Sequence, residues 1–334
     1  MKNKNDLRSY LLPLLVLLAF IGCGNKETKE QDGKKPLKIA GIVFQEDQFF
    51  RLIQFGMQYA ADQAGVELLL ANSASKPDKE IQLVNTYITR KVDAIIISPL
   101  SATASVTALK RARDKGIKVI TYNSTVEGDV PLAYIESDQR DLGAKTGQAA
   151  RRYIEEKLGG KAKVAVLAFK SQLPETSNGR SGGFIDEVKK LPGVEIVAEQ
   201  DAWLPEMAIK KVGDILTANP DINIIWAANE GGTVGAVMAV KNAGKGGQVA
   251  VFGTDTSKQL VDFLLSDNDI LQAITGQQPF AIGSRAVETA LAALKGEKVE
   301  KKVSMEGVLL ARNDPDKVRA FRAELSKLID QGNQ

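Results

Sequence analysis

The chain has 334 residues, which fits two average domains better than one, and its 44 Lys and Arg against 41 Asp and Glu leave a net charge of only +3. This near balance gives no indication of a nucleic acid or an acidic surface as partner. The chain has no histidine and one cysteine, which excludes Ser-His-Asp and Cys-His catalysis, HExxH zinc sites, an intrachain disulfide and CxxC redox chemistry.

Residues 1–22 have the pattern of a secretory signal peptide. A basic start, Met1 to Arg8, precedes the uncharged stretch Tyr10 to Gly22. A positive segment followed by a short apolar segment and small residues is typical of an export signal. The apolar stretch is shorter than the roughly 20 residues that a membrane-spanning helix needs. We therefore expect these residues to be removed on export.

The only cysteine, Cys23, follows the apolar stretch directly. The segment Phe20-Ile21-Gly22-Cys23 resembles the cleavage box of bacterial lipoproteins, with Phe where Leu is usual. The resemblance implies cleavage before Cys23 and its lipidation; the alternative is an unmodified cysteine in an ordinary signal peptide. Residues 23–36 then form a lipidated N-terminus and flexible tether, because Gly24 to Lys35 contains no bulky apolar residue. We expect an exported bacterial protein, in the periplasm or at the cell surface, that is bound to the membrane only through this lipid.

From Leu37 onward, short β-branched runs alternate with amphipathic stretches. The first half contains predicted strands at 38–44, 66–71, 92–98, 118–122 and 132–137, with predicted helices at 49–65, 77–90, 103–115 and 139–157. The pattern restarts with strands at 163–169, 194–199, 222–228, 248–253 and 270–276, and helices at 178–191, 206–218, 233–243 and 257–266. A short strand from Val308 and a charged helix at about Pro315–Asp330 end the chain. Apolar strands separated by helices predict an α/β fold with two parallel sheets, each covered on both faces.

Polar residues follow nearly every predicted strand. Ligands of open α/β sheets bind at the carboxyl ends of the strands, so these residues are the candidate ligand contacts. They are mostly carboxylates, amides and hydroxyls, with a few aromatic rings, which suit a neutral molecule rich in hydroxyl groups. Neither GxGxxG nor GxxxxGK[ST] occurs in the chain, so the sequence has no phosphate loop of these types.

Eight of these segments together resemble one protein family. They are IAGIV-FQEDQFF, VDAIIISP, KGIKVITYN, YIESDQRDLG, NGRSGGF, IIWAANEGGTVGAV, VFGTDTS and ITGQQPFAIG. In this order they resemble the type I periplasmic binding proteins, in particular the ribose-binding branch of the sugar receptors that serve ABC importers. The resemblance implies two Rossmann-like lobes with parallel sheets, joined by three hinge crossovers near 134–137, 275–277 and 306–308. The lobes would comprise residues 37–135 plus 277–306, and residues 136–276 plus 307–334.

The resemblance also implies a set of ligand contacts. In the first lobe, a polar residue and stacking aromatics of the family correspond to Asp47, Phe49 and Phe50. The family's Asp-Arg pair is replaced by Asn123 and Ser124, so a charged contact is absent there. In the second lobe the predicted contacts are Asn178, which replaces an Arg, and five residues that keep the family's residue type or role: Arg180, Trp203, Asn229, Asp255 and Gln277.

Several of these residues have an alternative interpretation. Asp255 precedes a predicted helix and is a candidate N-cap. Arg180 is a candidate partner for a carboxylate of its own lobe. Trp203 is a candidate core residue, and one of the two adjacent aromatics, Phe49 or Phe50, is a candidate for packing against the helix that follows. Trp226, inside a strand, is predicted to lie in the core. Adjacent Glu46 and Asp47 have no EF-hand spacing, so we expect neither a metal nor a cofactor.

The sequence thus predicts a non-enzymatic, extracytoplasmic lipoprotein that captures a sugar, a polyol or a related small molecule between two lobes for an ABC permease. The alternative is a ligand sensor that signals to a chemoreceptor or a histidine kinase. A glycosidase would need two carboxylates facing one bond, for which only Asp47 and Asp255 are candidates, and we do not predict it. LacI-type repressors share the implied fold, but the export signal stands where their DNA-binding segment would be, so we expect no nucleic acid. The soluble part is expected to be monomeric.

Overall fold

The computed structural model describes residues 36–331, which belong to one compact unit, Pro36–Gln334. The predicted signal peptide, Cys23 and nearly all of the predicted tether lie outside the described residues. None of the helices formed by residues 36–331 has the length and apolar character that crossing a membrane requires.

The first sheet is parallel throughout, in the strand order β11-β5-β4-β3-β1-β2. Its strands are β1 (Lys38–Val43), β2 (Glu67–Asn72), β3 (Ala94–Ile97), β4 (Lys118–Tyr122), β5 (Ala133–Ser137) and β11 (Lys302–Met305). The helices of this part of the fold are α1 (Gln48–Ala64), α2 (Pro77–Thr89), α3 (Val106–Asp114) and α9 (Pro279–Leu294). One apolar cluster packs α1 and α9 against one face of the sheet, and another packs α2 and α3 against the opposite face. The central strands are apolar because both faces are buried.

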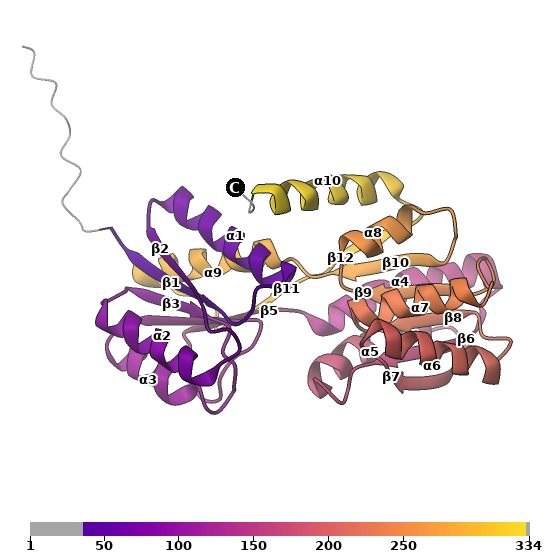
Figure 1. The fold of residues 1–334 in the computed structure, drawn as a ribbon, viewed down its shortest axis with the longest axis horizontal. Helices are drawn as coiled ribbons and strands as arrows, with labels where there is room; N and C mark the ends of the chain where they lie inside the picture. Colours follow the sequence, from indigo (N-terminus) through magenta and orange to yellow (C-terminus); the bar gives the residue numbers. More distant parts are fainter. Residues whose placement is uncertain (1–35, 332–334) are drawn as a thin grey trace, which may run out of the picture. The chain divides into compact units, whose positions relative to one another are not determined.

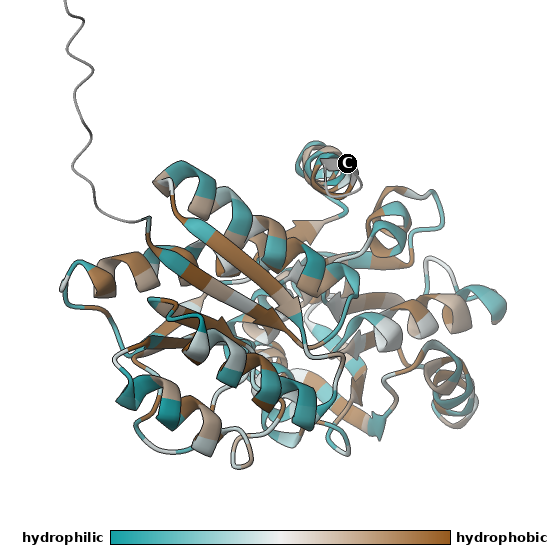
Figure 2. Ribbon diagram, turned by 60° about the vertical axis from the view of Figure 1, so that its left-hand side comes forward, coloured by the Kyte–Doolittle hydropathy of each residue, from teal (hydrophilic) through white to brown (hydrophobic). Residues whose placement is uncertain are grey.

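The second sheet has the order β12-β10-β9-β8-β6-β7, and only β12 runs antiparallel to its neighbour. Its strands are β6 (Lys161–Ala168), β7 (Gly193–Asp201), β8 (Ile224–Ala227), β9 (Ala250–Thr254), β10 (Leu271–Gly276) and β12 (Val308–Ala311). The accompanying helices are α4 (Gln139–Leu158), α5 (Pro174–Val188), α6 (Pro205–Ala218), α7 (Glu230–Asn242), α8 (Lys258–Leu265) and α10 (Pro315–Gln331). Two further apolar clusters cover the faces of this sheet. Figure 2 shows the strands as mostly hydrophobic ribbons, whereas the helices also carry hydrophilic residues.

The chain passes between the two sheets three times (Figure 1). It leaves the first sheet after β5, returns to it between β10 and α9, and leaves it again between β11 and β12. The structure thus has the predicted fold, two mostly parallel sheets with helices and three connections. The exact lobe boundaries, 37–135 plus 277–306 and 136–276 plus 307–334, remain our proposed division.

The closest helix pairs in the two halves are built in the same way, around small residues. A Cβ atom added at Gly56 of α1 would lie 1.9 Å from the carbonyl oxygen of Phe280 in α9, and one at Gly143 of α4 would lie 1.8 Å from that of Arg180 in α5. No larger residue fits at either position without separating the helices. These contacts hold the start of α9 and the middle of α5 in place, and both helices contribute to the cavity described below.

The prediction that Trp226 is a core residue is confirmed. Its side chain in β8 is fully buried, stacks on Phe184 with ring centroids 4.8 Å apart, and donates a hydrogen bond from Nε1 to Thr146 Oγ1 at 3.1 Å. Two elements were not predicted, α9 and β11. Strand β11 is short and half exposed, so its sequence lacks the apolar run by which the other strands were found.

Candidate functional site

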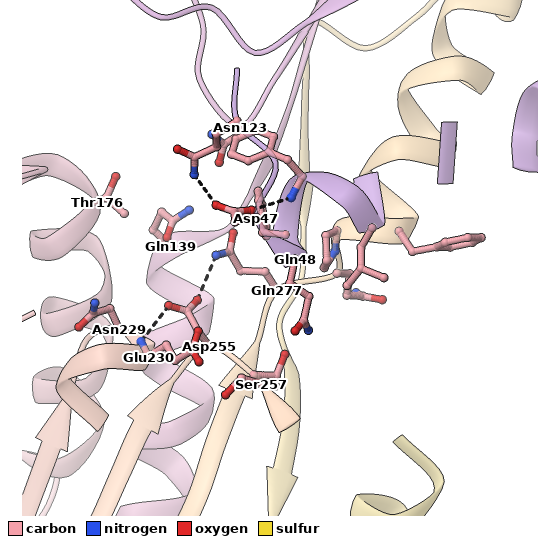
Figure 3. Close-up of a pocket in the computed structure, with 18 of the residues that line it drawn as sticks. Asp47, Gln48, Asn123, Gln139, Thr176, Asn229, Glu230, Asp255, Ser257 and Gln277 are labelled. Atoms are coloured by element: carbon pink, nitrogen blue, oxygen red, sulfur yellow. Dashed lines mark hydrogen bonds between the residues drawn. The ribbon is translucent and has the colours of Figure 1, made fainter. Parts of the chain in front are cut away.

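A cavity of about 1030 Å³ lies at the carboxyl ends of strands from both sheets (Figure 3). Nine of the ten residues predicted as ligand contacts line it, and five of these nine lie within two residues of a strand end. They are Asp47, Phe49, Phe50, Asn123, Arg180, Trp203, Asn229, Asp255 and Gln277. Because the strands of each sheet run parallel, the segments that follow them meet at one edge, which explains this convergence.

Asn178 is the predicted residue that the structure does not bring to the cavity. It is exposed on α5, whereas Thr176 and Arg180 of the same helix line the cavity. Successive residues of a helix are rotated by about 100°, so a residue two positions away from Arg180 points about 200° around the axis. The sequence motif alone did not reveal this rotation, and Thr176 rather than Asn178 lines the cavity from this turn of the helix.

Arg180 is the centre of a buried hydrogen-bond network. The residue is 5% exposed, and its guanidinium group lies 5.6 Å from the centre of the Phe169 ring. Its Nη1 atom donates to Asp255 Oδ2 at 3.1 Å and to the Ala228 carbonyl oxygen at 2.8 Å, and its Nε atom donates to Gln139 Oε1 at 2.8 Å. Arg180 therefore pairs with a carboxylate of its own half, as one interpretation held, and it lines the cavity as well.

Asp255 links this network to the hinge segments. Its Oδ1 atom accepts a hydrogen bond from Gln277 Nε2 at 3.0 Å, and its Oδ2 atom accepts one from the backbone N–H of Glu230 at 3.2 Å (Figure 3). Gln277 in turn accepts a hydrogen bond from Ser137 Oγ at 2.8 Å. Asp255 is not the N-cap of α8, because Ser257 occupies that position and its Oγ accepts from Leu260 N–H at 3.4 Å. The N-cap interpretation of Asp255 is thus wrong.

Asn229 and Trp203 form a second pair on the same side. Asn229 caps α7 through a hydrogen bond from Gly232 N–H at 3.1 Å, and its Nδ2 atom donates to the Trp203 carbonyl oxygen at 2.9 Å. The Trp203 side chain is half-buried and packs against the apolar cluster that contains Trp226. Trp203 therefore belongs both to the margin of the core and to the cavity wall, so its two interpretations are compatible.

The opposite wall, from the first sheet, consists of residues that are held more locally. Asp47 caps α1 by accepting a hydrogen bond from Phe50 N–H at 3.0 Å, and it also accepts one from Gln45 Nε2. Phe50 is 3% exposed, and its ring centre lies 4.4 Å from that of Phe44 in the core. Phe49 is half-buried. The structure therefore distinguishes the adjacent aromatics, with Phe50 mainly a core residue and Phe49 more available to the cavity.

Asn123 follows β4 with a left-handed backbone, at a φ of 58°. This conformation is uncommon for residues other than glycine, and asparagine is among those that tolerate it best. The residue is exposed, its Nδ2 donates to Ser98 Oγ at 3.4 Å, and Tyr134 donates a hydrogen bond from its hydroxyl to the Asn123 carbonyl oxygen at 3.0 Å. The turn thus holds an amide side chain at the cavity edge.

Glu230 gives the cavity an unbalanced negative charge. Although this residue is exposed in the cavity, the surrounding protein raises the pKa of its carboxyl group, first by desolvation and then through the charges of Asp255 and Asp47. A hydrogen bond with Ser257 opposes this rise. Arg180 is the only cationic side chain among the residues that line the cavity, and it is already paired.

Gln139 and part of α10 were not predicted to contribute to the cavity. Gln139 is the first residue of α4 and directly follows Asp138, the N-cap after β5, so the position after a strand was the signal that identifies it. The cavity residues from α10 are Phe321, Glu324, Leu325 and Leu328. They lie far from any strand end in the sequence, so no pattern indicated them.

The chemistry of these groups suits hydrogen bonding to hydroxyl groups. Carboxylate and amide oxygens accept from hydroxyls, amide and guanidinium N–H groups donate to them, and aromatic rings such as those of Phe49 and Trp203 cover apolar faces. Within residues 36–331, no group of three or more Cys, Asp or Glu residues is arranged to hold a metal ion.

Comparisons with known proteins agree with this geometry. Residues 42–298 match the family model described as a periplasmic binding protein domain. The chain is 30% identical to the ABC transporter periplasmic-binding protein YphF of Escherichia coli, over 80% of this chain and 84% of that protein. It is 32% identical to the ribose import binding protein RbsB of E. coli, over 79% of this chain and 86% of that protein.

A solved structure extends the comparison to the fold. The crystal structure of an ABC transporter periplasmic solute binding protein from Actinobacillus succinogenes, with bound D-allose, matches with a TM-score of 0.72 and 26% identity, over 85% of this chain and 100% of that one. These proteins bind solutes, so the prediction of a non-enzymatic binding protein is confirmed. The chain belongs to the family of periplasmic binding proteins.

Proposed function

We propose that the chain is the substrate-binding lipoprotein of an ABC importer and captures a small, neutral, polyhydroxylated ligand in this cavity. The observation that carries the proposal is the network of Arg180, Asp255 and Gln277, which lies at the strand ends and faces Asp47 and Phe49 of the other sheet. Hydrogen-bonding groups from both halves then contact one ligand, which favours the closed arrangement of the two lobes over the open one.

The relatives support a sugar or a sugar-like ligand. RbsB is named for ribose import, and the structure from A. succinogenes contains D-allose. Asn123 and Ser124 occupy the positions where many family members have an Asp-Arg pair. Charged side chains therefore contribute fewer hydrogen bonds to ligand hydroxyl groups there. Because hydrogen bonds to charged groups contribute about 1.5–3 kcal/mol each, this difference argues for a ligand other than ordinary ribose or galactose. Another pentose, a polyol or a modified sugar fits these groups better.

A ligand screen tests the proposal. Purified chain beginning at Gly24 is heated with individual pentoses, hexoses, inositols, linear polyols and nucleosides, and the unfolding temperature is followed by tryptophan fluorescence. A ligand at 100 times its Kd adds about 2.7 kcal/mol of stability and raises Tm measurably. We expect at least one sugar or polyol to do so. Stabilisation by amino acids or peptides alone would contradict the proposed ligand class.

The importer role and the lipid anchor are tested in cells. The compound found in the screen is radiolabelled, and its uptake is compared in cells with and without the chain. Loss of uptake without the chain supports the importer role, whereas normal uptake with a lost chemotactic or transcriptional response supports a sensor. Cys23→Ser separates the anchor from the site, because we expect the variant to leave the membrane fraction and to retain ligand affinity.

A further inference from the structure

Helix α10 lies outside the part of the chain that matches the family model. The family match ends at residue 298, whereas α10 comprises Pro315–Gln331. In Figure 1 it is the yellow helix that runs from the side of α8 toward α1. It contacts α8 and β12 of the second half, and α1 of the first half. Besides the three chain crossovers, α10 is therefore a further contact between the halves.

The first part of α10 is firmly attached to the second half. Val318 is fully buried in the apolar cluster of that half, and Phe321 packs against the same cluster. Arg322 forms an ion pair with Asp262 of α8 at 3.0 Å. Just before the helix, the guanidinium group of Arg312 donates hydrogen bonds to three carbonyl oxygens, those of Phe263, Ser266 and Leu271, at 2.7, 2.5 and 2.8 Å. This end of α10 therefore moves with the second half as one body.

The last turns of α10 lie against α1 of the other half. Ile329 lines a small gap together with four residues of α1, which are Gln48, Arg51, Leu52 and Phe55. One residue earlier, Leu328 faces the main cavity, which Leu52 also lines. Leu328 and Ile329 are only half-buried, in contrast to Val318. The distal contact is consequently weak compared with the proximal one, and it can break without unfolding α10.

The first turns of helix α1 line both the main cavity and the gap next to α10. Its N-cap Asp47 and its residue Phe49 line the cavity, and Phe55 lines the gap with Ile329, whereas Gln48 and Leu52 line both. The hinge segments at Gln277–Pro279 and Val308 line the same cavity. Rotation that brings Asp47 toward Asp255 must therefore move Phe55 relative to α10, which stays with the second half.

We propose that α10 is an interlobe strap that favours the open cleft. The last turns of α10 adjoin α1 in this structure, where the cavity measures about 1030 Å³, and in the proposed mechanism closure separates Ile329 from Phe55. A contact that exists in one state only shifts the equilibrium toward that state by its own free energy. The strap thus sets the amount of ligand-binding free energy that closure requires. The effect on affinity rests on the proposed ligand-binding function, whereas the effect on the open–closed equilibrium does not.

The test uses Ile329→Asp, with Ser326→Asp as the matched control. Ser326 is exposed on the same helix, so its substitution adds the same charge without touching α1. In the full chain with Cys23→Ser, spin labels on Asp78→Cys in α2 and Lys189→Cys after α5 report the distance between the halves. Without ligand, we expect Ile329→Asp to increase the population with the closed-state distance, and Ser326→Asp to match the parent chain.

The affinity for the sugar found in the screen provides the second readout. We expect Ile329→Asp to bind it about five-fold more tightly, the effect of losing a half-buried aliphatic contact from the open state alone. An unchanged distance distribution in folded Ile329→Asp, or weaker binding, would overturn the strap. If Asp lowers Tm, Ile329→Ala repeats both measurements with a milder change. If the screen yields no ligand, the proposed function fails, while the strap is still decided by whether Ile329→Asp shifts the distance distribution toward shorter distances than in the parent chain.

Discussion

The two walls of the cavity are built differently. In the wall from the second sheet, Arg180 and Gln277 both donate hydrogen bonds to the Asp255 carboxylate, so the three side chains hold one another in place. In the wall from the first sheet, Asp47 is hydrogen-bonded only to residues close to it in the chain, and exposed Asn123 is hydrogen-bonded to Ser98 and Tyr134 of the neighbouring strand segments. Groups that are already in place lose less conformational entropy on binding. The comparison indicates that the second wall is the preformed receptor and that the first wall completes the site on closure.

Burial is the physical reason for this difference. A buried guanidinium group is tolerated only when it is paired and hydrogen-bonded, so the network around Arg180 stabilises the fold as well as the site. Asp47 and Asn123 are exposed and need no such partners. Substitutions in the second wall should therefore affect both stability and binding, and substitutions in the first wall should affect mainly binding.

Arg180→Ala should give the largest effect on stability. Removing one partner of a buried ion pair leaves Asp255 without its cation, and we expect a loss of about 3 kcal/mol in the free energy of unfolding by urea. Arg140→Ala is the control, because Arg140 also pairs with an aspartate but lies on the surface, where the expected loss is below about 1 kcal/mol. Equal losses in the two variants would contradict the contribution of burial to the network around Arg180.

Asp255→Ala should give the largest effect on binding. It removes a carboxylate that holds Arg180 and Gln277, and we expect the affinity for the ligand to fall by about 1.5–3 kcal/mol, or roughly 10- to 150-fold. Isothermal titration calorimetry of the folded variant measures this loss. Asp267→Ala, an exposed aspartate that does not line the cavity, should bind like the parent chain. Unchanged affinity in Asp255→Ala would remove Asp255 from the site.

Two substitutions of Asp47 separate its capping role from ligand contact. Asp47→Ala loses the N-cap of α1 and should cost about 1 kcal/mol of stability, whereas Asp47→Ser retains a capping oxygen and should cost a few tenths. Both variants lose the carboxylate, so both should bind the ligand more weakly by a similar factor. Thermal unfolding and titration calorimetry are measured on the same samples. Weaker binding in the alanine variant alone would show that Asp47 acts only through the cap.

Glu230→Gln should give the smallest effect on stability, and the size of this effect depends on pH. The raised pKa means that the folded chain binds this proton more tightly than the unfolded chain, so ionised Glu230 destabilises the fold above that pKa. We expect Glu230→Gln to raise Tm slightly at pH 7, with the gain shrinking as the pH falls toward 4. A gain that grows on acidification would contradict the proposed electrostatic cause.

The position of a residue just after a predicted strand was a good predictor of whether it lines the cavity. It did not predict the direction in which the side chain points. The rule placed Asp47, Asn123, Asn229, Asp255 and Gln277 together, because parallel strands end at a common edge. It did not separate buried Phe50 from Phe49, and it did not reveal the outward direction of Asn178. These distinctions depend on which face of each helix packs against the core. The local sequence does not specify that packing.

The sequence by itself determined the alternation of strands and helices, the two halves and most of the strand-end residues, because periodicity and residue type act over a few neighbours along the chain. Only the tertiary structure decided that Arg180 and Asp255 form one network with Gln277, and that α10 reaches across to α1. These contacts join residues that are tens to hundreds of positions apart in the chain. Which residues contact one another is determined by how the sheets and helices pack together. The local sequence pattern carries no information about this packing.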